Sequence, residues 1–134
     1  MQMEKRKKTI ILLILSIVWS ILIFVLCTMP ANDLPKYRIL YMDKIAHFGF
    51  FFVQSVLLSL LLRYRTKRSY LDIIILSTFQ AFLYGGVIEF LQNEFFNRTG
   101  DLYYLMADTL GWLLGAVTYP GFFRLFNKRA KKYT

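Results

Sequence analysis

Residues 10–29 read IILLILSIVWSILIFVLCTM, a run of twenty residues without a charged side chain. A helix of this length rises about 30 Å at 1.5 Å per residue, which matches the hydrocarbon thickness of a bilayer. Soluble helices interrupt their apolar stripe with a polar face, whereas this run is apolar all round. Because lipid offers no hydrogen-bond partners to an open backbone, the run predicts a membrane-spanning helix.

Three further apolar runs lie at residues 46–62, 71–91 and 102–123. Together the runs predict an all-α membrane protein with four transmembrane helices, at about residues 9–29, 44–63, 70–92 and 101–124. The chain has 134 residues, so we expect a single transmembrane domain over 1–134 in a compact bundle. A basic start followed by an apolar run is also typical of a signal peptide. The length of the run and the lack of an Ala-x-Ala-like site favour a retained first helix.

The basic residues are distributed unevenly along the chain. The 17 lysines and arginines give a formal net charge of +9, and most lie at residues 5–8, 63–68 and 124–132. These clusters share one side of the predicted helices, so the positive-inside rule places both termini in the cytoplasm. Basic residues there face anionic headgroups, which indicates membrane lipids rather than nucleic acid as partners. The single Cys27 excludes an internal disulfide.

Small and aromatic residues suggest how the helices pack. Gly111 and Gly115 are four residues apart in the fourth run, and Gly85-Gly86 lies in the third. Such spacing lets helix backbones approach closely, which we expect to occur within the monomer. We expect Trp19 and Trp112 to face lipid or the membrane interface.

Eight polar or charged residues fall at the outer ends of the last three predicted helices. They are Asp43, Lys44 and His47 at the start of the second helix, Glu89 and Gln92 at the end of the third, Arg98 and Asp101 before the fourth, and Asp108 two turns inside it. Acidic residues are costly within a membrane and normally face the bundle interior, where they pair with one another or with a ligand. We therefore expect these residues to converge on one polar site at the extracytoplasmic face.

The chemistry of this cluster has several interpretations. Lys44, Arg98 and the start of the fourth helix suit an anion such as a phosphate or carboxylate headgroup. His47 beside an acid, either Glu89 or Asp108, could instead act in acid–base catalysis. One histidine without paired ligands argues against a metal site, and no cofactor-binding motif is present.

The same residues also have structural interpretations. Asp101 can cap the fourth helix, and Asp108 with His47 or Glu89 with Arg98 can form ion pairs that hold the bundle. For the whole set we favour function, because small residues alone can hold a bundle and buried ions are an expensive way to do it.

The order of these motifs resembles one known family. Over residues 24–118 the chain carries, in order, Asp43-Lys44-x-x-His47, Glu89-x-x-Gln92, Arg98-x-x-Asp101 and the spaced Gly111 and Gly115. This pattern resembles the VanZ-like family, bacterial membrane proteins named after a protein linked to resistance to the glycopeptide antibiotic teicoplanin. Tyr104 stands where many members have a second aspartate, and Asp108 where an asparagine is frequent. The resemblance implies a multi-pass protein of the bacterial plasma membrane with a role in the cell envelope.

These observations lead to one main expectation and two alternatives. We expect the site to bind an anionic envelope lipid or a cell-wall precursor headgroup and so to modulate the envelope or its glycopeptide sensitivity. The first alternative is a membrane-embedded enzyme acting on such a lipid. The second is a structural or partner-binding protein whose cluster only locks the fold. The sequence leaves the ligand and the oligomeric state open.

Overall fold

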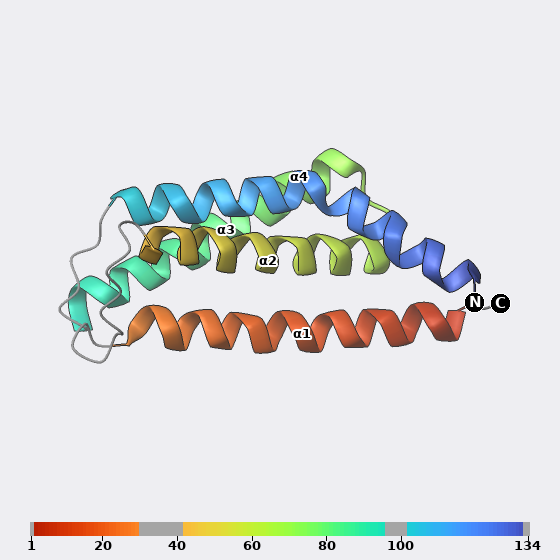
Figure 1. Ribbon diagram of the computed structural model, residues 1–134, viewed down its shortest axis with the longest axis horizontal. Coiled ribbons are helices and arrows are strands. Elements are labelled where there is room, and N and C mark those ends of the chain that lie inside the picture. Colours follow the sequence, from red (N-terminus) through yellow and green to blue (C-terminus); the bar gives the residue numbers. More distant parts are fainter. Residues whose placement is uncertain (1, 30–41, 96–101, 133–134) are drawn as a thin grey trace.

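The computed structural model describes residues 2–29, 42–95 and 102–132. In this part of the chain it contains four α-helices, namely α1 (Gln2–Thr28), α2 (Met42–Arg65), α3 (Tyr70–Phe95) and α4 (Leu102–Lys132). The helices run up and down, so the end of α1, the start of α2, the end of α3 and the start of α4 lie together (Figure 1). The all-helical architecture agrees with the prediction from the sequence.

Two helices extend far beyond the bounds that the sequence predicts, and the other two by only two or three residues at an end. α1 begins at Gln2 and α4 continues to Lys132, each well outside its apolar run. Lysine and glutamate are good helix formers, so the flanking segments can extend the helix beyond the apolar part. At the start of α1, Lys8 Nζ lies 2.9 Å from Glu4 Oε1, an i,i+4 ion pair that supports the first turns.

Among the described residues, three helices are long and apolar enough to cross a membrane: Met3–Thr28, Lys44–Arg65 and Tyr70–Phe95. The apolar run of α4 is diluted by tyrosines, glycines, threonines and Asp108, which lower its mean hydropathy. The crossing of the membrane by α4 therefore stays a prediction, as does the cytoplasmic location of the termini.

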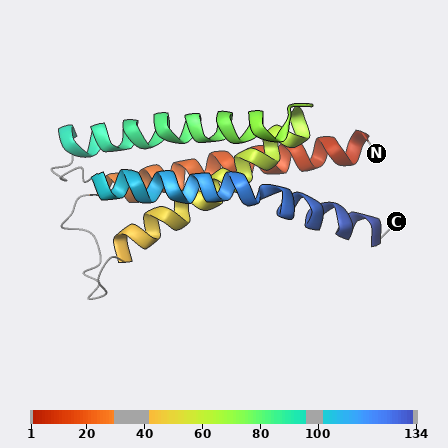
Figure 2. The same ribbon diagram turned by 90° about the horizontal axis from the view of Figure 1, so that it is seen from above.

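α2 is the centre of the bundle. It contacts α1, α3 and α4, and its contact with α4 is the most extensive in the described structure. Figure 2 shows α2 crossing the bundle obliquely, while α3 and the first half of α4 run nearly side by side. A helix that contacts all its neighbours can position side chains from each of them.

Two glycines explain the close approach of α2 and α4. A Cβ on Gly111 would collide with the carbonyl oxygen of Phe48, and one on Gly115 would lie 2.5 Å from the carbonyl oxygen of Phe52. These glycines therefore pack helix against helix within the monomer, which confirms the prediction. Gly86 differs, because nothing lies within 4 Å of a Cβ built there.

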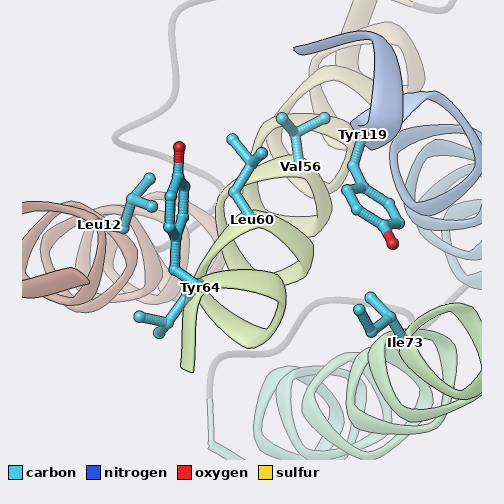
Figure 3. Close-up of a cluster of buried hydrophobic side chains, with 7 residues drawn as sticks. Leu12, Val56, Leu60, Tyr64, Ile73 and Tyr119 are labelled. Carbon is cyan, nitrogen blue, oxygen red and sulfur yellow. The ribbon is translucent and has the colours of Figure 1, made fainter. Parts of the chain in front are cut away.

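Two apolar clusters fill the interior. Near the start of α1, Leu12, Leu60, Ile73 and Tyr119 are among the buried side chains (Figure 3). Toward the opposite end, Ile23, Cys27, Phe51, Ala81, Ile88 and Trp112 form the second cluster. The expectation that Trp112 faces lipid or the interface is wrong, since its side chain is fully buried.

Buried hydroxyls join the helices between these clusters. Ser55 Oγ donates a hydrogen bond to the Trp112 carbonyl oxygen at 2.6 Å. The hydroxyl oxygens of Ser59 and Ser77 lie 3.0 Å apart, which links α2 to α3. Polar contacts of this kind are common between helices in membranes, where small polar residues lie at the helix interfaces.

Candidate functional site

The centre of the polar cluster is a pair of buried side chains, one from α2 and one from α4. His47 Nδ1 lies 3.1 Å from Asp108 Oδ1, within hydrogen-bonding distance. His47 is 6% exposed and Asp108 is 3% exposed, so the pair is removed from solvent. The prediction that Asp108 faces the bundle interior is confirmed, and its partner is His47.

The other ring nitrogen of His47 faces α1. Cys27 Sγ lies 3.9 Å from His47 Nε2, and the thiol is 1% exposed. Gln92, also buried, donates a hydrogen bond from Nε2 to the Cys27 carbonyl oxygen. Through these contacts all four helices contribute to the site. The imidazole lies between a thiol and a carboxylate, which holds the ring in one orientation.

Lys44 lies one turn closer to the start of α2 than His47. Its Nζ is 4.6 Å from the centre of the Tyr104 ring, a cation–π contact between α2 and α4. The same ring is 4.8 Å from the His47 ring, with the planes inclined at 45°. These contacts form a continuous series, Lys44–Tyr104–His47–Asp108, which runs from the partly exposed start of α2 to the buried carboxylate.

Of the remaining candidates, only Glu89 has a side chain among the described residues. Glu89 is partly buried on α3, one turn before the buried Gln92. Asp43 lies in the first turn of α2, and its side chain is outside the described residues. Arg98 and Asp101 also lie outside the described residues, so their expected places in the cluster stay predictions.

Two members of the site were not among the residues predicted from the sequence. The sequence indicates of Cys27 that, as a single cysteine, it cannot form an internal disulfide, and it marks Tyr104 as a departure from the family motif. The sequence carries a signal for both residues, because Cys27 is near the C-terminal end of its apolar run and Tyr104 is one turn before Asp108. Residues four apart on a helix share a face, so Tyr104 could have been placed with Asp108.

The arrangement favours some chemistries over others. Since His47 separates the thiol from the carboxylate, the three groups do not converge on one point as metal ligands would. Among the described side chains, no group of three His, Cys, Asp or Glu residues could hold a metal ion. An imidazole oriented by a carboxylate is a recurrent feature of acid–base sites, and a lysine near it also suits an anion.

Comparison of the chain with protein-family models, curated proteins and solved structures finds no significant match. The described residues form an all-helical structure in which three helices are long and apolar enough to cross a membrane, and a buried imidazole–carboxylate pair lies near one end.

Proposed function

We propose that this protein is a VanZ-like plasma-membrane protein of bacteria whose four helices cross the bilayer with both termini in the cytoplasm. Its polar site, at the extracytoplasmic face, binds the headgroup of an anionic envelope lipid or cell-wall precursor. Through this binding it modulates the envelope and its sensitivity to glycopeptide antibiotics. The motif order described above supports the family, and the uneven distribution of basic residues supports the orientation.

The observation that carries the proposal is the series Lys44–Tyr104–His47–Asp108 at one end of the bundle. Its buried members pair with each other, while the lysine lies at the more exposed end. Intramembrane ionisable groups are expensive, and they commonly mark the path or the site of a polar ligand.

The local backbone also favours a negative ligand. α2 begins at Met42 and α4 at Leu102, and both N-termini lie at the same end of the molecule (Figure 1). The N-terminus of a helix carries a partial positive charge and unpaired N–H groups, so it attracts phosphate or carboxylate. Lys44, near the start of α2, adds a full charge beside these dipoles.

Lipid binding by purified variants tests this proposal. Lys44→Gln and His47→Gln should weaken binding of undecaprenyl phosphate and phosphatidylglycerol relative to phosphatidylcholine. The loss should be roughly tenfold or more, because one charged hydrogen bond contributes about 1.5–3 kcal/mol. Lys7→Gln is the matched control, since it removes an exposed charge at the opposite end of the bundle.

A structural role of the cluster predicts a different pattern. Removing one partner of a buried ion pair costs about 3–5 kcal/mol, so His47→Gln would then reduce the amount of folded protein. Loss of fold in step with loss of the antibiotic phenotype, and no selectivity for anionic lipid in the parent protein, would refute the binding proposal.

The contact between His47 and Asp108 also favours a second candidate, an enzyme acting on the bound lipid. A carboxylate 3.1 Å from Nδ1 orients the ring so that Nε2 can exchange a proton, and the Cys27 thiol faces that nitrogen. Replacing a general acid or base lowers turnover about 10²–10⁴-fold while much of the substrate affinity remains. Accumulation of one lipid on His47→Asn, Glu89→Gln or Asp108→Asn, absent from the parent, would establish the enzyme. The same lipids on parent and variants would favour the binder.

A further inference from the structure

A groove lies at the opposite end of the bundle from the polar site, between α1 and α4. Its volume is about 410 Å³, and its floor is formed by α2. No Cα atom of α1 lies within 8 Å of a Cα atom of α4 in the described helices, so the two leave α2 uncovered between them. Figure 3 shows part of the wall and floor, with Leu12 of α1 beside Tyr64 of α2.

The dimensions of the groove match one leaflet of a bilayer. Its floor extends along α2 from Phe52 to Tyr64. Twelve residues of helix rise about 18 Å, slightly more than half of the ~30 Å hydrocarbon thickness. The groove also opens sideways, since Ile11 and Leu15 on its α1 wall are 55% and 47% exposed.

The opposite wall comes from the second half of α4. Pro120 lies inside this helix, and proline bends a helix by removing one backbone hydrogen bond. Figure 1 shows the part beyond the bend turning toward α1. Phe122 and Phe126 of this part line the groove. The walls on both sides are therefore apolar.

Charge is confined to one end of the groove. Of the described side chains that line it, Lys8 alone is charged, and its side chain is 28% exposed. Three further basic residues, Lys5, Arg6 and Arg65, line a neighbouring hollow beside the start of α1. Glu4 pairs with Lys8, but the further basic residues at this end, Lys5, Arg6 and Arg65, keep its net charge positive.

An apolar channel one leaflet long with cations at one end complements an anionic phospholipid. We propose that the groove holds an acyl chain of a glycerophospholipid with an anionic headgroup, whose phosphate lies near Lys8. The lipid belongs to the leaflet that surrounds the start of α1, which is the cytoplasmic leaflet in the orientation proposed above. This site goes beyond the proposed function, because it is at the other end of the helices and its ligand is a structural lipid.

Lipid retention tests the proposal without reference to membrane orientation. The protein is placed in nanodiscs of equal parts dioleoyl-phosphatidylglycerol and dioleoyl-phosphatidylcholine, extracted in mild detergent and analysed by native mass spectrometry. The parent chain should retain phosphatidylglycerol about fivefold over phosphatidylcholine, since one basic residue near a membrane surface contributes roughly 1 kcal/mol. Lys8→Gln should lower this preference about fivefold, to what the polar site at the other end of the bundle contributes. Lys7→Gln, whose side chain is exposed and outside the groove, should preserve it.

A second pair of variants tests the apolar part. Leu15→Trp places a larger side chain in the groove and should lower retention of both lipids, whereas Ile14→Trp, exposed on α1 and outside the groove, should not. Lys44→Gln, which weakens the proposed outer site, should leave the effect of Lys8→Gln unchanged, so the two proposals can fail separately. Equal retention of both lipids by the parent, an equal effect of Lys7→Gln, or a lipid-free dimer whose partner covers the groove would overturn the inference.

Discussion

Gly111→Ala should separate α2 from α4 and thereby open the polar site. The Cβ of an alanine at this position would collide with the carbonyl oxygen of Phe48. That atom belongs to a helix backbone, so no side-chain rotation can relieve the contact. His47 precedes Phe48, and Asp108 is one turn before Gly111. Moving the two helices apart here therefore lengthens the 3.1 Å contact between His47 and Asp108.

The expected increase in the open population follows from the free-energy cost of adding a methyl group to a packed interior. Extra methyl groups in a well-packed core cost about 1–3 kcal/mol, which corresponds to a roughly 5- to 150-fold larger open population. Cys27 reports this population, because it is the single cysteine of the chain and is 1% exposed. We expect the rate of maleimide labelling of Cys27 in detergent to rise by that factor in Gly111→Ala.

Gly86→Ala is the matched control for this experiment. It also adds one methyl group to a helical glycine, but nothing lies within 4 Å of the new Cβ. Alanine is favoured over glycine in a helix by about 1 kcal/mol, so labelling should be unchanged or slower. Equal labelling rates in Gly111→Ala and the parent would refute the view that the glycine contact determines the distance between these helices.

Two further predictions concern the core and the topology. Ser59→Ala and Ser77→Ala should each destabilise the bundle by about 1–3 kcal/mol by leaving a buried hydroxyl unpaired. The double variant should cost less than the sum of the two, and additive effects in thermal unfolding would mean that the 3.0 Å contact is not a coupled pair. In a Cys27→Ser background, a cysteine introduced at Asn97 should react with an impermeant maleimide in whole cells, and one at Thr66 should not. The reverse labelling would place the polar site in the cytoplasm.

Hydropathy and length were sufficient to predict the helices, but not the direction in which each face points. The apolar runs predicted all four helical segments, because a backbone in lipid has to satisfy its own hydrogen bonds. Trp112 was misplaced for a physical reason. Lipid and protein interior are equally apolar, so an apolar run in a membrane helix does not distinguish its buried face from its lipid-facing one. Small and ionisable residues indicate the buried face of a membrane helix better, because Gly111 and Asp108 both lie on the buried face of α4.

The candidate site was predictable in its location and less so in its contacts. Because successive helices run in opposite directions, the sequence predicts which residues share an end of the bundle. His47, Gln92 and Asp108 are buried at the same end, as predicted. Which atoms meet depends on helix rotation, and one residue along a helix turns a side chain by about 100°. For this reason the contact between Cys27 and His47 could not be derived from spacing within any one helix.

The glycine contacts connect the packing of the bundle to the chemistry of the site. Gly115 and Gly111 meet α2 at Phe52 and Phe48, one turn apart on both helices. One turn closer to the start of each helix, the same two faces carry Asp108 on α4 and Lys44 on α2. His47 lies between these two residues. The contact between α2 and α4 is therefore so close that a position in it has either no side chain, as at the two glycines, or a side chain that pairs with one on the other helix, as His47 does with Asp108. A close helix contact that excludes water strengthens the attraction between an imidazole and a carboxylate, so the glycines are a precondition of the site.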